Sequence, residues 1–133
     1  MDIGKQFVTV RSWLTEMQDC VQKVDFERCR AIFAPDVAAF GSLGERLVGL
    51  AHLEADQWRR VWPRIDGFTF DLDHLEWGGT DTVLWLACPW TSEGRRDDGT
   101  RFVRPGRITA VLENRNGAWV AVHTHHSLAG AAA

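Results

Sequence analysis

The sequence has no tyrosine and only three cysteines among its 133 residues. The lack of a phenol excludes any mechanism in which tyrosine donates a proton. Cys20, Cys29 and Cys88 are far apart and form no Cys-x-x-Cys motif, so their spacing predicts neither a zinc knuckle nor a redox pair. We expect all three to be reduced, buried thiols of a cytoplasmic protein.

Long hydrophobic runs and an excess of positive charge are also missing. The longest apolar stretch without a charge, residues 82–90, is about half of the roughly 20 residues that span a membrane. The sequence does not open with a basic segment followed by an apolar one, so we expect no secretory signal. Because the net charge is −3, no basic face is expected. The sequence therefore predicts a protein that binds neither membranes nor nucleic acids.

The composition is that of a folded protein. Hydrophobic residues make up 45% of the chain and charged residues 25%, both ordinary values for a globular domain. The length suits one hydrophobic core rather than two. We predict a single domain over residues 1–128 and a flexible tail over residues 129–133.

The first half of the chain has the periodicity of helices. Apolar residues recur at steps of three and four at Ile3, Phe7, Val10, Leu14, Met17 and Val21. Asp25 is a candidate N-cap for a second, shorter helix. A third helix is predicted over residues 50–62, where Pro63 ends it.

The second half has the alternation of antiparallel strands. The apolar positions change parity near Asp73, which predicts a bulge or bend. Residues 83–90 are apolar on both parities, as in a central strand covered on two faces. Asn116 and Gly117 predict a tight turn between the last two strands. Three helices before a long sheet predict an α+β fold, in which a strongly curved antiparallel sheet forms a cone around a pocket.

Several motifs resemble those of a known family. They are residues 33–37 (Phe-Ala-Pro-Asp-Val), Gly49 and Leu50, Trp62, and residues 109–111, 116–119 and 123–127 near the C-terminus. The last three are similar to the Thr-x-Val, Asn-Gly-x-Trp and His-x-His-x-Ser pattern of the nuclear-transport-factor-2-like superfamily. The chain looks most like its SnoaL-like branch and the association domain of calcium/calmodulin-dependent kinase II. The resemblance covers nearly the whole chain and implies the same cone-shaped fold.

The superfamily contains isomerases, cyclases, hydrolases and modules that only bind or assemble, so the fold does not name an activity. The carboxylate base of ketosteroid isomerase corresponds to about Gly41, and its tyrosine to about Met17. The cavity arginines of the kinase association domain correspond to about Ala87, Ala110 and His126. The resemblance therefore implies neither the isomerase mechanism nor an anion-binding cavity of that type.

Six residues are predicted to form a site. Five would contact a ligand: Met17, Trp58, Trp62, Trp85 and Thr124. The other, His126, would be the catalytic group, because a histidine at the mouth of a cone can exchange a proton near neutral pH. The alternatives are a satisfied core histidine and tryptophans that only fill the core.

His126 is placed at the end of an inward stripe made by Ile108, Ala110, Leu112, Val120 and Val122. Val111, Trp119 and Ala121 would then make the opposite face apolar too, which predicts a homodimer through the sheet. On that face His123, His125 and Ser127 would bond to neighbouring strands or to a partner subunit. No third ligand completes the His-x-His pair, so no metal site is predicted.

The predicted function is a SnoaL-like domain that binds a small apolar or aromatic molecule. If it is an enzyme, it would be a cofactor-free isomerase, cyclase or dehydratase that works by proton transfer. The alternative is a non-catalytic ligand-binding module or a homo-oligomeric assembly module. The charged run of residues 95–98 is interpreted as a solvated loop tip.

Overall fold

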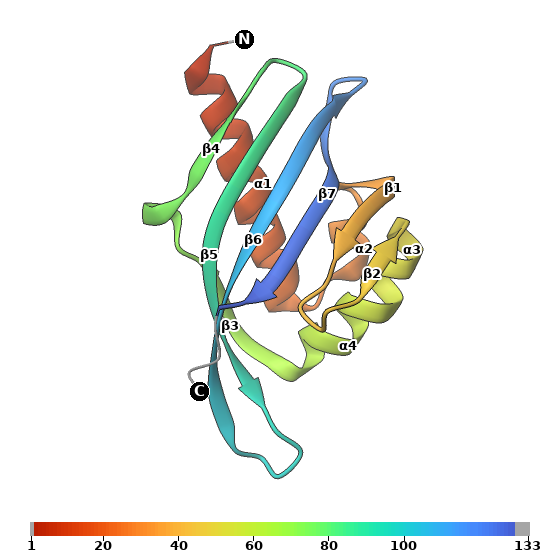
Figure 1. Cartoon of the computed structure of the whole chain (residues 1–133), viewed down its shortest axis with the longest axis vertical. Coiled ribbons are helices and arrows are strands. Elements are labelled where there is room, and N and C mark those ends of the chain that lie inside the picture. The colour runs from red at the N-terminus through yellow and green to blue at the C-terminus, as the bar shows by residue number, and fades with distance from the viewer. Residues whose placement is uncertain (1, 130–133) are drawn as a thin grey trace.

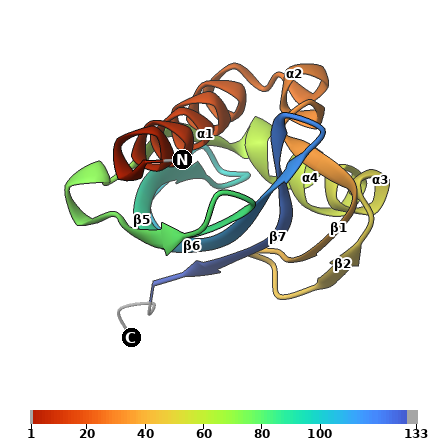
Figure 2. The ribbon, with the colours of Figure 1, turned by 90° about the horizontal axis from the view of Figure 1, so that it is seen from above.

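The structure, a computed structural model that describes residues 2–129, has an α+β fold. Helix α1 lies on the concave side of one curved, open sheet (Figures 1 and 2). The helices are α1 (Ile3–Lys23), α2 (Phe26–Arg30), α3 (Leu50–Leu53) and α4 (Arg59–Val61). The strands are β1 (Phe33–Phe40), β2 (Arg46–Val48), β3 (Ile65–Phe70), β4 (Glu76–Gly79), β5 (Val83–Arg95), β6 (Arg101–Arg115) and β7 (Ala118–Leu128). The predicted fold class is confirmed.

Helix α1 begins and ends with recognisable caps. The Asp2 carboxylate accepts a hydrogen bond of 2.8 Å from the backbone N–H of Lys5. Val24 ends the helix in a left-handed conformation, with φ 52°. The residues that α1 buries against the sheet include Val10, Trp13, Leu14, Met17, Cys20 and Val21. The helical periodicity therefore identified the buried face, although Ile3 at its start is exposed.

The third predicted helix is present but is not a regular α-helix. After α3 the backbone widens into a π-helical turn, Glu54–Trp58, then continues through α4 and ends in a 3-10 turn, Trp62–Arg64. A π-turn adds a residue to one helical turn and often occurs at functional sites. Here it directs Gln57 and Trp58 into the interior, where both are buried.

The strand order is β2-β1-β7-β6-β5-β3, and β4 pairs with the other end of β5. The pairs are antiparallel except that β1 runs parallel to β7. The predicted sheet was antiparallel throughout. The structure corrects this for one pair: β1, the first strand, lies beside β7, the last one, and runs parallel to it. No hairpin joins these two strands, so the connection between them does not force opposite directions. The hairpin between β5 and β6 projects beyond the other strands (Figure 1).

A bulge in β7 changes which residues face inward. Val111 pairs with His123, but Leu112 pairs with Ala121, so Val122 is the extra residue. Ala121 is consequently fully buried, whereas Val120 and Val122 are only half-buried. The predicted inward stripe is therefore correct for β6 and for His126, but wrong for the first half of β7.

Strand β5 is buried on one face only. Its even-numbered residues from Leu84 to Ser92 are buried, while the odd-numbered ones are exposed or half-buried. The prediction of a strand covered on both faces is wrong, because no layer formed by residues 2–129 lies over the outer face of the sheet (Figure 2). The parity change near Asp73 is produced by a 3-10 turn, Leu72–His74, rather than by a bulge. The predicted turn at Asn116 and Gly117 is confirmed, with φ values of 55° and 88°.

The described residues form one continuous hydrophobic core. No helix within residues 2–129 is both long and apolar enough to cross a membrane. Cys20, Cys29 and Cys88 are buried and unpaired. Apart from Ala129, the tail predicted over residues 129–133 lies outside the described residues.

Candidate functional site

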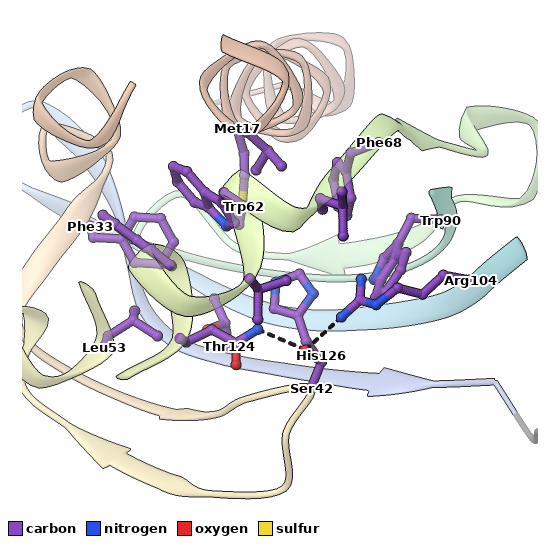
Figure 3. Close-up of a pocket in the computed structure, with 15 residues that line it drawn as sticks. Met17, Phe33, Ser42, Leu53, Trp62, Phe68, Trp90, Arg104, Thr124 and His126 are labelled. Carbon is purple, nitrogen blue, oxygen red and sulfur yellow. Dashed lines mark hydrogen bonds between the residues drawn. The ribbon is translucent and has the colours of Figure 1, made fainter. Parts of the chain in front are cut away.

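A small cavity lies between α1 and the inner face of the sheet (Figure 3). Its lining includes five of the six predicted site residues: Met17, Trp58, Trp62, Thr124 and His126. The cavity volume is about 20 Å³. That volume holds about one water molecule, far below the 300–1,000 Å³ or so of a pocket for a drug-sized ligand. In this conformation the cone is almost filled.

The two tryptophans of the third helical segment fill most of the space. The rings of Trp58 and Trp62 stack, with centroids 4.9 Å apart and an interplanar angle of 20°. Trp58 also meets Phe33 edge-on at 5.0 Å and is only 2% exposed. Their spacing of four residues, which spans α4, places both rings on one side of the segment.

His126 projects from β7 into this cavity and is 9% exposed. Its ring centroid lies 5.9 Å from that of Trp90, and its ring nitrogens have no hydrogen-bond partner within residues 2–129. Burial, together with the positive charge of Arg104 and the neighbouring His125, lowers the pKa of His126 to about 3. The imidazole is therefore neutral at pH 7, and its charged form is strongly disfavoured.

Arg104, on β6, reaches the same cavity and is the main residue that the sequence analysis missed. It is 9% exposed and donates hydrogen bonds to Ser92 Oγ at 3.3 Å and to Ser42 Oγ at 2.9 Å. Its guanidinium carbon lies 5.2 Å from the centroid of the Trp90 ring. No carboxylate within residues 2–129 forms an ion pair with it, and burial lowers its pKa from the ordinary value. A buried charge without a counter-ion is energetically costly.

Ser42 links Arg104 to the third helical segment. Its hydroxyl oxygen also accepts a 2.8 Å hydrogen bond from Gln57 Nε2, so its own proton can be donated elsewhere (Figure 3). Nearby, the buried indole N–H of Trp90 has no acceptor within the described chain. The cavity wall thus offers more hydrogen-bond donors than it satisfies.

A larger, open cleft adjoins the cavity. It has a volume of about 520 Å³ and shares Val61, Ile65 and Arg104 with the cavity wall. We call it the arginine cleft, because five arginines line it: Arg59, Arg60, Arg64, Arg95 and Arg104. The other lining residues are Leu43, Val61, Pro63, Ile65, Gly94 and Phe102. No acidic residue of the described chain lines it.

The sequence was compared with protein families and with curated proteins. A family model described as a SnoaL-like domain matches residues 10–131. The chain belongs to the SnoaL-like domain family. No curated protein matches the sequence.

Solved structures share the fold of this SnoaL-like domain at low sequence identity. A nuclear-transport-factor-2-like superfamily protein from Salmonella enterica serovar Typhimurium gives a TM-score of 0.83 at 16% identity, over 99% of this chain and 96% of that one. A proposed dehydratase of the nuclear-transport-factor-2-like family from Streptomyces avermitilis gives a TM-score of 0.81 at 15% identity, over 98% of this chain and 100% of that one. The association domain of C. elegans calcium/calmodulin-dependent kinase II gives a TM-score of 0.70 at 18% identity, over 93% of this chain and 95% of that one. These likenesses show the fold alone.

At the position that corresponds to the isomerase base, this SnoaL-like domain has the ends of two neighbouring side chains where a larger residue would project. A Cβ atom on Gly41 would lie 1.9 Å from Glu45 Oε1 and 2.4 Å from Gln57 Oε1. Both oxygens are buried and have no hydrogen-bond partner in the described chain. Glu45 does not line the cavity, so its carboxylate does not replace the missing base there.

Trp85 does not belong to the cavity, so the prediction for this residue is corrected. It points from β5 to the outer face of the sheet and is 47% exposed. His123 and His125 also lie on that face, where His123 Nδ1 is 2.9 Å from the carbonyl oxygen of Ala38. Within residues 2–129, no three His, Cys, Asp or Glu residues gather in a group that could hold a metal ion.

The sequence did contain a signal for Arg104. The inward stripe of Ile108, Ala110 and Leu112, continued back along β6 in steps of two, reaches Gly106 and then Arg104. Arg95, interpreted as part of a solvated loop tip, instead ends β5 and lines the arginine cleft. Neither residue could be assigned to a site without knowing how far the two strands extend.

Proposed function

We propose that this SnoaL-like domain binds a small apolar or aromatic molecule at the mouth of the cone, and that His126 exchanges a proton with it. The observation that carries the proposal is the junction between the inner cavity and the arginine cleft. The cleft has the volume of an ordinary ligand site and an apolar floor, whereas the inner cavity does not. The body of the ligand would lie in the cleft, with one end directed inward past Arg104.

Burial disfavours the imidazolium of His126, so this residue would accept a proton only in a reaction that creates negative charge on the ligand beside it. In such a step the ligand C–H bond breaks, its proton passes to an imidazole nitrogen, and the electron pair moves to a carbonyl oxygen. The positive charge of the buried Arg104 favours this build-up of negative charge, and the net charge of the site does not change. Isomerisations, cyclisations and dehydrations of carbonyl compounds can each begin with this step, without a cofactor. The Streptomyces avermitilis protein of the same fold is itself described as a proposed dehydratase.

Binding can be tested with 2-naphthalenemethanol, a neutral aromatic probe, by calorimetry and amide NMR. We expect signals of Val61 and Ile65 to shift and Phe102→Ser to weaken binding at least fivefold, because Phe102 lines the cleft. Val103→Ser is the matched control, since the adjacent side chain is exposed outside the cleft. No binding, or an equal loss in both variants, would contradict the proposal.

Proton transfer can be tested with 2-indanone, whose methylene protons exchange with deuterium oxide. We expect the protein to accelerate exchange, and His126→Gln to reduce that acceleration by roughly 10²–10⁴. His125→Gln removes the adjacent, outward-facing imidazole and serves as the control. Equal rates for the two variants would remove His126 from the mechanism.

A second proposed function is self-assembly through the outer face of the sheet. Two adjacent rows of paired residues cross four strands there: Ala38, His123, Val111 and Trp85, and then Phe40, His125, Thr109 and Ala87. None of them is an acidic residue, lysine or arginine, and Phe40 and Trp85 are both exposed. Exposed apolar patches of this kind mark interfaces. The kinase association domain has the same fold and is named for assembly.

The homodimer can be tested by sedimentation. We expect a dimer at micromolar concentration and a monomer for Trp85→Glu, with Val103→Glu as an exposed control outside the two rows. A monomeric wild-type protein would contradict this proposal. We also propose a cytoplasmic location, because the three cysteines are buried and unpaired.

A further inference from the structure

The charges around the arginine cleft are not balanced within the chain. Arg59 is paired with Glu54 and Arg95 with Asp66. Each carboxylate is shared with a second arginine, Arg30 or Arg101, so the cleft arginines are only partly neutralised. The contact between Arg64 and Asp97 is 3.9 Å long and lies at the exposed surface, which makes it weak. Arg60 and Arg104 form no ion pair within residues 2–129. A chain with a net charge of −3 thus has a positive cleft, which would attract anions.

Arg104 is the residue with unused binding capacity. Two of the five N–H donors of a guanidinium are occupied, both by serine hydroxyls. The buried N–H of Trp90, whose ring lies under the guanidinium, also lacks an acceptor in the described chain. Both residues line the inner cavity, and unsatisfied donors there favour a ligand that supplies acceptors and negative charge.

We propose that the ligand is an organic carboxylate with a flat apolar body, held by Arg104 at the junction of the cavity and the cleft. This inference rests on the proposed ligand-binding function and specifies its substrate class. A single planar guanidinium matches the two oxygens of a carboxylate. Val61, Pro63, Ile65 and Phe102 provide the apolar surface for the rest of the molecule.

The carboxylate would also change the chemistry of His126. Arg104 is one of the groups that disfavour the imidazolium, and a bound anion would offset its charge. His126 would then be a stronger base when a carboxylate ligand is bound than it is in the empty site.

The test compares 1-naphthoate, its neutral analogue 1-naphthamide, and 1-naphthyl phosphate by calorimetry at low salt. We expect the wild-type protein to bind 1-naphthoate at least tenfold more tightly than 1-naphthamide. Arg104→Gln should remove this preference by weakening 1-naphthoate alone, and Arg104→Lys should retain part of it. Arg107→Gln is the matched control, because Arg107 lies on the same strand but faces outward, where it bonds to Ser127.

The outcomes separate the two proposals. Equal affinity of the wild-type protein for 1-naphthoate and 1-naphthamide would overturn the carboxylate assignment and leave ligand binding in place. An equal loss in Arg104→Gln and Arg107→Gln would overturn it as well, because the effect would then be one of overall charge. Tighter binding of 1-naphthyl phosphate would assign the site to phosphate instead. If no probe bound, the proposed ligand-binding function itself would fail.

Discussion

The inner cavity and the arginine cleft share three wall residues but differ in almost every other property. The cavity has about 20 Å³ of free space among stacked aromatic rings, whereas the cleft has about 520 Å³ and five arginines. Burial disfavours charge on His126 inside, while Arg60 and Arg64 outside are exposed to solvent. The comparison shows that space and charge lie at the mouth of this cone, and that the buried, neutral His126 lies just behind it. Arg104 and Trp90 form the boundary between the two regions.

The largest expected change in stability comes from removing one of the large side chains that fill the inner cavity. We expect Trp58→Ala to lower the free energy of unfolding by about 3–5 kcal/mol, because a fully buried indole that packs on Phe33 and Trp62 is lost. Urea denaturation measures this value. Trp85→Ala removes the same side chain from the outer face and should cost less than about 1 kcal/mol in the monomer. Similar losses in the two variants would mean that the interior is not tightly packed.

A smaller effect is expected at the boundary. Gly106 pairs with Trp90 across the sheet, and a Cβ atom there would lie 2.3 Å from the indole ring. We expect Gly106→Ala to destabilise the fold by about 1–3 kcal/mol, because it overpacks the site and displaces Trp90. Denaturation together with 1-naphthoate calorimetry would show whether moving Trp90 also disturbs Arg104. An unchanged free energy of unfolding would show that Trp90 can move aside at little energetic cost.

The pH dependence of stability tests whether His126 is shielded from water in the folded protein. The pKa of His126 is about 3 in the folded protein against 6.5 in the unfolded chain, so the unfolded chain binds more protons between these values. The folded state should thus be fully stable above about pH 6.5 and lose about 2 kcal/mol of stability on going from about pH 7 to about pH 5.

This pH effect can be assigned with two variants measured by urea denaturation over the same range. His126→Gln should remove the loss, because its side chain does not titrate, while His125→Gln should retain it. The range lies above the unfolded pKa of carboxylates, so Glu54, whose pKa the neighbouring Arg30 and Arg59 lower to about 2, contributes little there. A slope that persists in His126→Gln would show that water reaches the cavity and that the imidazole is not desolvated.

Much of the fold could be predicted from local signals in the sequence. The spacing of Val10, Leu14, Met17 and Val21 identified the buried face of α1, and Asn116 with Gly117 identified the last turn. The tryptophans at 58 and 62 and the histidine at 126 were correctly directed inward. These features depend on residues close together in the chain, whose side-chain directions follow from helix and strand geometry.

The failures have a different origin. Trp85 was placed inside because an apolar run does not reveal which face of its strand is covered. Val122 was placed on the wrong face because one bulged residue reverses the alternation that precedes it. Arg104 was overlooked because arginines are normally exposed, and its burial depends on Ser42, Ser92 and Trp90 from other segments.

The sequence by itself determined the fold class and the chemistry that is available: a histidine on the inward stripe, a set of tryptophans, and no tyrosine. The tertiary structure alone decided where the free space lies and which charge borders it. Free volume is what remains after side chains from distant strands and helices have packed, and the burial of Arg104 depends on the same neighbours. Neither quantity belongs to a local segment, so neither can be read from one.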